Sequence, residues 1–446
     1  MRRTIEPILK KWKDQVDRLP IILRGARQVG KSFTVEKFGN EHFESLVVVN
    51  FEFRPELAAC FDTLDPLSIC AKLEILCKTR IIPGKTLLFL DEIQNCPKAI
   101  MAMRYFKEKL PELHVIAAGS LLEFALHEEQ FSFPVGRVQF LYLKPMSFYE
   151  YLSSQNHDRL IEFMDQVNVD QIIEPVIHEQ LLTLLRQYIL IGGMPMIVRR
   201  FLDTHSFLEC QLLLGSLLET YRSDFPKYAT KTQYKQVQLF FEKAPGLVSQ
   251  HFKYSHVSPE HRSADLKIAL EQLGWAGLLH KVTATSASGI PLMAHAKENK
   301  FKLLFLDIGL VNCADKLEFQ TVWDTQLLQI NAGAQAEQLV GQELLAYADP
   351  YVNSQLFYWE REKKGSIAEV DYVIQVGRQI IPIEVKAGAT GSLKSLAQFL
   401  SDKRQPFGVR ISQHPLSFHD RILSVPLYLI SQLSRLIQQT SAKIAT

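Results

Sequence analysis

The feature that most constrains this chain is a glycine-bounded loop near its start, GARQVGKS, which fits the pattern GxxxxGK[ST] at every specified position. The loop lies between an apolar stretch typical of a strand, Pro20–Leu23, and a helical run. Its glycines let backbone N–H groups converge on one point, and a helix that begins there directs its positive N-terminus at the same point. The pattern therefore predicts a phosphate-binding strand–loop–helix unit within an α/β domain. The residues expected to bind the phosphates are Gly25, Ala26, Arg27, Gln28, Val29, Gly30, Lys31 and Ser32.

The last two loop residues carry the groups that a nucleotide and its metal need. Lys31 is expected to reach the β- and γ-phosphates of ATP, and Ser32 to supply a hydroxyl to Mg²⁺. A chance glycine turn is the alternative, and the strand–loop–helix context argues against it. The loop thus predicts ATP and Mg²⁺ as cofactors.

A second strand supplies acidic partners for this loop. The apolar run Leu87–Leu90 is followed by Asp91 and Glu92, at the strand end where α/β proteins bind ligands. Asp91 is expected to bind the magnesium, usually through water, and Glu92 to orient and activate the attacking water. Another expected strand, Leu46–Phe51, separates the loop from the acidic strand along the chain. This insertion, with the glutamate after Asp91, resembles the additional-strand, catalytic-glutamate class of ATPases.

Two further residues are candidates for the same chemistry. Ser120 follows the expected strand His114–Ala118 and is placed to sense the γ-phosphate and the attacking water; a plain turn serine is the alternative. Arg137 precedes a further expected strand, Val138–Leu143, and an arginine can neutralise developing phosphoryl charge, in cis or from a neighbouring subunit. A surface or structural ion pair is the alternative for Arg137.

The whole chain has 446 residues, which favours two to four domains over one core. Fifty basic and 48 acidic side chains give a net charge of only +2, so nothing global requires a nucleic acid or a membrane as partner. The six cysteines form no CxxC pair, and together with a start that lacks a secretion signal they predict a cytoplasmic protein. The most apolar long stretch, Tyr188–Val198, is shorter than the roughly 20 residues of a membrane helix, so no membrane span is predicted.

After the first α/β region the pattern changes twice. Apolar residues recur at helical spacing from about Ser147 to Tyr228, interrupted once by Gly192–Pro195. From Lys231 to about Leu310, the pattern of three helices followed by a polar turn between two apolar stretches predicts a small winged helix. Its basic residues are candidates for contacts with nucleic acid, and a solvated surface is the alternative. The tail Thr440–Thr446 is expected to fray.

The rest of the chain predicts a second α/β unit. A helix is expected at Ala334–Tyr347 and another at Leu393–Leu400. The expected strands are Leu356–Glu360, Glu369–Gln375, Ile380–Lys386, Pro406–Ile411 and Val425–Ile430.

Four residues of this unit form a candidate metal site. Glu384 and Lys386 project from one face of their strand because strand side chains alternate, Asp371 lies on the preceding strand, and Glu337 lies on the helix before. This helix–three strands–helix–strand order resembles the PD-(D/E)xK nuclease superfamily. Asp371, Glu384 and Glu337 would then bind Mg²⁺, and Lys386 would position or deprotonate a water. A nuclease fold can also persist without cleaving, so both outcomes stay open.

Eight motifs taken together resemble a prokaryotic family of predicted AAA-type ATPases that carry a C-terminal nuclease-related domain of unknown function. They are LRGARQVGKS, LLFLDEIQ, AAGSLLEF, PVGRVQFLYLKPMSFYEYL, ILIGGMPMIV, FKLLFLDIGL, AEVDYV and IPIEVKAG. The resemblance spans nearly the whole chain. It implies a P-loop AAA-type ATPase core in residues 1–150, a helical lid in 151–228, a winged-helix-like segment in 229–320 and a restriction-endonuclease-like α/β domain in 321–446.

The resemblance also assigns individual residues. It assigns nucleotide binding to Gly25, Gly30, Lys31 and Ser32, with Asp91 and Glu92 at the acidic strand. Ser120 and Arg137 match the family's GS and GR positions. Ala26 stands where the family often has proline, and Ser32 where it often has threonine; neither change removes a required group.

The leading hypothesis from the sequence is an ATPase that couples its nucleotide state to a nuclease-like module acting on DNA or RNA. The alternative is a non-enzymatic assembly or signalling switch, in which ATP drives association of copies of the chain and the C-terminal domain binds a partner without cleavage.

Overall fold

The structure is a computed structural model that describes residues 1–128, 134–315, 332–361, 368–388 and 392–445. The chain divides into two compact units. The N-terminal unit comprises Met1–Pro145 with the short segments Trp275–Gly277 and Asp349–Asn353, and the C-terminal unit comprises Met146–Gly274, Leu278–Ala348 and Ser354–Thr446.

The N-terminal unit is built on a five-stranded sheet in the order β2-β3-β4-β1-β5, with every neighbouring pair parallel. The strands are β1 (Ile21–Arg24), β2 (Ser45–Asn50), β3 (Thr86–Asp91), β4 (His114–Ala118) and β5 (Gln139–Tyr142). All five expected strands are therefore confirmed to within one residue at each end. β2 lies between the loop and β3 along the chain, as expected. In the sheet, however, β4 separates β1 from β3 and β2 lies at the edge, because chain order does not fix the order in which crossovers place parallel strands.

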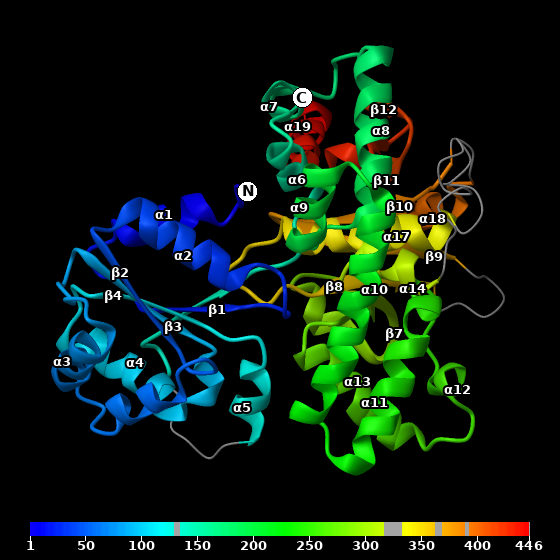
Figure 1. Cartoon of the computed structure of the whole chain (residues 1–446). Coiled ribbons are helices and arrows are strands. Elements are labelled where there is room, and N and C mark those ends of the chain that lie inside the picture. The colour runs from blue at the N-terminus through cyan, green and yellow to red at the C-terminus, as the bar shows by residue number, and fades with distance from the viewer. Residues whose placement is uncertain (129–133, 316–331, 362–367, 389–391, 446) are drawn as a thin grey trace. The chain divides into compact units, whose positions relative to one another are not determined.

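Helices cover both faces of this sheet (Figure 1). They are α1 (Glu6–Lys13), α2 (Lys31–His42), α3 (Pro66–Cys77), α4 (Pro97–Lys109) and α5 (Leu122–Glu128), with short 3-10 helices η1 (Pro55–Phe61) and η2 (Ile93–Asn95). Because successive side chains of a strand point to opposite faces, neighbouring residues of one strand contact different helices. Val47 and Leu88 share a core cluster with residues of α3 and α4. Their neighbours Leu46 and Leu87 lie against Gly39 of α2, where a side chain would meet them within 3.1 Å.

The first part of the C-terminal unit is helical, as expected. The helices are α6 (Phe148–Ser154), α7 (Asp158–Gln166), α8 (Pro175–Ile191), α9 (Pro195–Thr204), α10 (Phe207–Asp224), α11 (Lys231–Lys243), α12 (Tyr254–Val257), α13 (Ser263–Trp275) and α14 (Ile308–Ala314). Among the described residues no single helix is long and apolar enough to cross a membrane, whereas α8 and α9, bent by 119° where they meet, reach that length and composition only as a pair.

Two glycines make the sharp bend between α8 and α9. Gly192 has φ +73°, and a Cβ there would lie 2.0 Å from the Oδ1 atom of Asp307. A Cβ on Gly193 would lie 2.0 Å from the carbonyl oxygen of Met146, whose own N–H donates to the Gly193 carbonyl at 2.7 Å. The helices turn here because only glycine allows backbone and buried carboxylate to approach so closely.

The second sheet has eight strands in the order β12-β13-β11-β10-β9-β8-β6-β7. Its strands are β6 (Leu279–Thr285), β7 (Ala296–Phe305), β8 (Leu356–Glu360), β9 (Glu369–Val376), β10 (Gln379–Val385), β11 (Gly408–Ser412), β12 (Ser417–His419) and β13 (Ile422–Pro426). Parallel pairing joins β6 to β8. The β6–β7 hairpin of the expected winged-helix-like segment is thus continuous with the sheet of the expected nuclease-like domain. The domain boundary expected at residues 320 and 321 lies outside the described residues.

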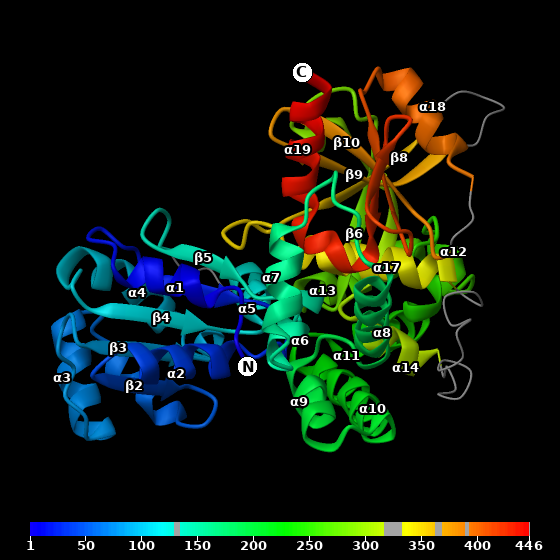
Figure 2. The ribbon, with the colours of Figure 1, turned by 90° about the horizontal axis from the view of Figure 1, so that it is seen from above.

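Three more α-helices lie in the described part of this unit: α17 (Ala332–Ala346), α18 (Lys394–Lys403) and α19 (Leu433–Ala445). Figure 2 shows α18 and α19 on opposite sides of strands β8–β10. The predicted order of helix, three strands, helix and strand is therefore present as α17, β8, β9, β10, α18 and β11.

Two expectations near the chain end are wrong. Only the first two residues of the expected strand Val425–Ile430 belong to a strand, β13, which ends at Pro426. The residues that follow form the 3-10 helix η6 (Leu427–Gln432), because proline has no N–H to extend the ladder. The tail expected to fray from Thr440 is the last part of α19, and Thr440 itself is fully buried. The helix α19 has an apolar face, and the burial of this face stabilises the helix to its end.

Candidate nucleotide site and carboxylate cluster

The phosphate loop follows β1 and leads directly into α2, as predicted. Gly25 has φ +151°, and a Cβ there would lie 2.3 Å from the carbonyl oxygen of Leu143. Gly30 caps α2 with φ +91°, in the left-handed region that favours glycine. Both glycines of the motif are therefore required by the backbone itself, before any ligand is considered.

Arg3 braces this loop from the chain start. Its guanidinium donates to the carbonyl oxygens of Val29 at 2.9 Å and Lys144 at 2.6 Å. Charge-assisted bonds of this kind hold a loop in one conformation more firmly than neutral ones do. Sequence analysis missed Arg3 because no motif connects it to the loop.

The side chain of Lys31 folds back onto the phosphate loop. Its ammonium donates to the carbonyl oxygens of Gly25 at 3.0 Å and Ala26 at 2.9 Å. Burial lowers the pKa of Lys31 to about 8, although the carboxylates of Glu92 and Asp91 act in the opposite direction. The buried ammonium is thus held against the loop by two of its carbonyl oxygens.

Asp91 lies at the end of β3, only 5% exposed, beside the hydroxyl of Ser32. Both of its carboxylate oxygens are 3.0 Å from the Ser32 Oγ, and one of them accepts from the Asn50 side-chain amide at 3.0 Å. Burial raises the pKa of Asp91, and the nearby Glu92 charge adds to this increase. Hydroxyl and carboxylate oxygens are ligands that Mg²⁺ accepts, so Ser32 and Asp91 fit the predicted metal. Asn50, at the end of β2, is a further residue of this site that sequence reasoning did not find.

Glu92 and Ser120 lie at the ends of adjacent strands. Glu92 has φ +51°, and its carboxylate accepts from the Gln94 amide at 2.5 Å. Ser120 is buried after β4, the strand between β1 and β3, and its Oγ accepts from the Arg27 Nε at 3.2 Å. The structure therefore brings Ser120 to a residue of the phosphate loop, at the same sheet edge as Asp91.

Arg137 is not brought to this edge. It precedes β5, which runs parallel to β1 with Gln139 opposite Ile21 and Tyr142 opposite Arg24, so it lies where the strands begin while the loop lies where they end. A four-residue strand separates the two edges by about 13 Å. The Arg137 side chain is 48% exposed and pairs with Glu108 at 3.0 Å. This placement argues against action in cis; action in trans and a structural ion pair stay open.

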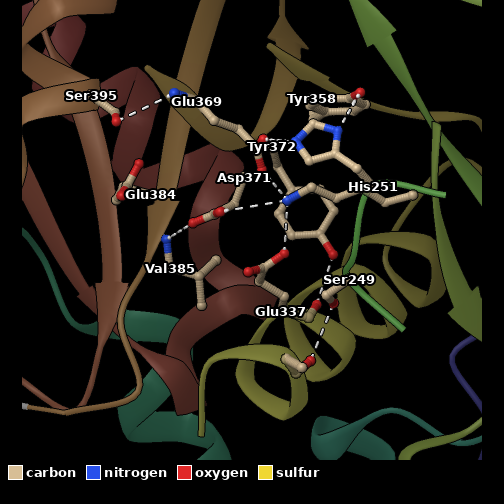
Figure 3. A network of polar contacts seen from close by, with 12 residues as sticks. Ser249, His251, Glu337, Tyr358, Glu369, Asp371, Tyr372, Glu384, Val385 and Ser395 are labelled. Atoms are coloured by element: carbon tan, nitrogen blue, oxygen red, sulfur yellow. Dashed lines mark hydrogen bonds and ion pairs between the residues drawn. The ribbon is translucent and has the colours of Figure 1, made fainter. Parts of the chain in front are cut away.

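Two of the four residues singled out in the C-terminal unit, Glu337 and Asp371, lie around a lysine that sequence reasoning missed. The Lys302 Nζ, on β7, lies 3.1 Å from a Glu337 oxygen and 3.9 Å from an Asp371 oxygen, and it forms a further ion pair with Glu369. Figure 3 labels these three acidic residues within one network of polar contacts. Glu369 also contacts His251. We call Lys302, Glu337, Glu369, Asp371 and Glu384 the carboxylate cluster. Lys302 lies in the motif FKLLFLDIGL, 35 residues before Glu337, and no local pattern connects that motif to the acidic residues.

The other two motif residues pair with each other. Lys386 donates to Glu384 at 2.7 Å, and the second Asp371 oxygen accepts from the Val385 N–H at 2.7 Å, which ties β9 to β10. Burial, with the Asp371 charge, raises the pKa of both Glu337 and Glu384. Burial also acts to lower the pKa of Lys302, but the surrounding carboxylates outweigh it and raise that pKa above its usual value.

The metal shell expected from Glu337, Asp371 and Glu384 stays a prediction. Across the described ranges, no group of three or more histidine, cysteine or acidic side chains is arranged to hold a metal ion. The ammonium of Lys302 lies among the carboxylates of Glu337, Glu369 and Asp371.

Family models match three successive parts of the chain. The model described as an AAA domain matches residues 17–152, and two models described as domains of unknown function, DUF8612 and DUF4143, match residues 182–321 and 332–430. No curated protein matches the chain.

Several solved structures are similar to the chain at low identity. A Walker-type ATPase of Pyrococcus abyssi is 16% identical with a TM-score of 0.43, covering 70% of this chain and 96% of its own. The ORC2 protein of Aeropyrum pernix, in complexes with ADPNP and ADP, is 13% identical with a TM-score of 0.36, covering 71% and 94%. The ORC1 protein of the same organism, in complex with DNA, is 10% identical with a TM-score of 0.31, covering 72% and 94%.

These TM-scores are all below 0.5, so the assignment depends on the family match and on the geometry of the loop and β3. Residues 17–152 form an AAA-type P-loop domain, an ATP-binding fold.

Proposed function

We propose that the chain binds ATP with Mg²⁺ in its AAA-type domain and hydrolyses it, and that the nucleotide state controls a nuclease-like module in the C-terminal unit. One observation supports this most: Ser32 of the loop and Asp91 of β3 are joined by hydrogen bonds of 3.0 Å although 59 residues separate them. Such a hydroxyl–carboxylate pair beneath a phosphate loop is what a magnesium–nucleotide complex requires.

The roles follow from position. Ser32 and Asp91 would hold Mg²⁺, which neutralises phosphate charge when bound. Lys31 and the loop N–H groups bind the β- and γ-phosphates. Glu92, next to Asp91 at the end of β3, accepts a proton from the attacking water, and Ser120 orients that water or the γ-phosphate. Arg137 acts, if at all, on the nucleotide of a second copy of the chain.

The nuclease-like assignment of the C-terminal unit is supported by the element order and by the convergence of the motif residues. Asp371 on β9 reaches the backbone of Val385, directly after Glu384 on β10. Such a module would recognise DNA or RNA through its fold whether or not it cleaves.

The second candidate, a switch whose C-terminal domain binds a partner without cleavage, is favoured by one observation. Lys302 is buried among the carboxylates that would hold the metal of a nuclease. The purified protein incubated with ATP and labelled DNA or RNA, with Mg²⁺ and with chelator, tests both candidates.

We expect phosphate release from ATP that requires Mg²⁺ and is lost in Lys31→Ala. Absence of hydrolysis by the wild-type protein would contradict the ATPase proposal. Shortening of the nucleic acid that disappears in Asp371→Asn would favour the first candidate for the C-terminal unit, and intact nucleic acid would favour the second.

A further inference from the structure

The carboxylate cluster already contains a cation. Three acidic side chains from α17 and β9 surround the Lys302 ammonium, as oxygen ligands surround a hard metal ion. We propose that Lys302 takes the place of a divalent metal in this cluster, so that the C-terminal unit keeps its carboxylates together without a metal and has no metal-dependent cleavage of phosphodiesters. This inference concerns the cluster alone and does not depend on ATP hydrolysis.

The carboxylate oxygens are largely engaged already. Asp371 uses one oxygen on the Val385 N–H and turns the other toward Lys302, while Glu369 uses one on Lys302 and one on His251. Glu384 uses one oxygen on Lys386, and its other oxygen is buried and has no hydrogen-bond partner among the residues that the structure describes. A divalent cation would have to displace these partners to obtain its ligands.

Lys302 is fixed where it is. Its side chain is 4% exposed, and its ammonium also lies 5.5 Å from the centre of the Tyr358 ring. The backbone of Lys302 pairs with Val282 of β6, and its strand neighbours Phe301 and Leu303 are buried. If the ammonium swung out, it would leave buried negative charges without a partner, which is strongly unfavourable.

The charges around the cluster explain why one cation is needed there. Burial and the Asp371 charge raise the pKa of Glu337, so the site holds more negative charge than burial favours. The ammonium of Lys302 relieves this repulsion permanently, since its own pKa is raised by the same neighbours against the effect of burial. Lys386 provides a second fixed positive charge beside Glu384.

The test is thermal unfolding of the nucleotide-free full chain with and without MnCl₂. The variants are Lys302→Met, which removes the charge at similar length, and Lys302→Met combined with Asp371→Asn. Lys300→Met is the matched control, because Lys300 lies on the same strand but is 54% exposed and pairs with Glu360 at the surface.

We expect Lys302→Met to unfold at a lower temperature and Mn²⁺ to raise its Tm by several degrees, an effect that the added Asp371→Asn removes. The wild-type protein and Lys300→Met should show no Mn²⁺ shift that depends on Asp371. A folded Lys302→Met that gains no stability from Mn²⁺ would overturn the inference. So would calorimetric binding of Mn²⁺ to the wild-type protein that Asp371→Asn abolishes, a measurement that decides the matter even if Lys302→Met does not fold.

Discussion

Ser32 and Asp91 meet because two parallel strands end at the same sheet edge. Burial at this edge disfavours the charged forms of the ionisable side chains there. Asp91 is buried with a raised pKa, and Lys31 is buried with a lowered pKa. Opposite charges nearby only partly offset this burial, so both side chains are held in a state that a bound magnesium–phosphate complex would relieve. Perturbed groups of this kind are typical of functional sites.

The lowered pKa of Lys31 predicts proton uptake on nucleotide binding. In the nucleotide-free chain its pKa is about 8, and phosphate anions at the ammonium favour the charged form and raise that pKa. At a pH about half a unit above this value, ATP binding should therefore take up a fraction of a proton, whereas two units below it Lys31 is already charged and uptake should be near zero. Binding enthalpies of a non-hydrolysable ATP analogue, measured in two buffers of different ionisation enthalpy, check this. Equal enthalpies in both buffers at the higher pH would contradict it.

A mixing experiment can distinguish a role of Arg137 in trans from a purely structural role. Because its own loop lies at the opposite sheet edge, a catalytic Arg137 must serve a neighbouring copy. Mixing Arg137→Ala protein with Lys31→Ala protein should then restore part of the ATPase activity, since some interfaces pair an intact loop with an intact arginine. Recovery is read from phosphate release, with oligomer mixing verified separately. No recovery in mixed oligomers would leave Arg137 as the partner of Glu108 alone.

At the scale of elements, the bend between α8 and α9 is fixed by a buried acid. Asp307 caps α14 by accepting from the N–H groups of Gly309 at 3.0 Å and Leu310 at 3.3 Å, and it also accepts from the Gly193 N–H at 2.6 Å. Burial raises the pKa of Asp307 to about 6. One carboxylate thus joins the α8–α9 bend to the start of α14.

Gly192→Ala should disrupt this junction. Its φ of +73° is unfavourable for alanine, and the added Cβ would lie 2.0 Å from Asp307, so a loss of about 3 kcal/mol or more is expected. The matched control is Gly215→Ala in α10, where nothing lies within 4 Å of the new Cβ and the helix should gain about 0.5–1 kcal/mol. Thermal unfolding checks the pair. A Gly192→Ala protein as stable as the wild type would contradict the account of the bend.

For the whole molecule, local patterns predicted the elements better than their arrangement. The five strands of the first sheet follow from short apolar runs, and Asp91 follows from its place after one of them. The position of β4 between β1 and β3 does not, because strand order depends on crossovers that leave no local trace. Lys302 was missed for a related reason: it joins the carboxylates only because β6 pairs with β8 across chain segments far apart in sequence.

The stop of β13 at Pro426 could have been predicted, since a proline within an apolar run ends a ladder. The position of Arg137 could not, because the sequence places it near a strand without saying which edge of the sheet it reaches. Nothing local indicated that Asn50 would reach Asp91, since that contact needs β2 and β3 to be neighbours.

The central claim is that this fold binds ATP through the loop and hydrolyses it through Glu92, and one comparison tests it most directly. Nucleotide affinity and phosphate release are measured side by side for the wild type, Lys31→Ala and Glu92→Gln. Lys31→Ala should lose ATP binding, whereas Glu92→Gln should bind ATP as tightly as the wild type and lose roughly 100-fold or more in hydrolysis, because Glu92 acts on the water and not on the phosphates. Hydrolysis by Glu92→Gln at the wild-type rate would contradict the assignment of Glu92, and undiminished ATP binding by Lys31→Ala would contradict the role of the loop.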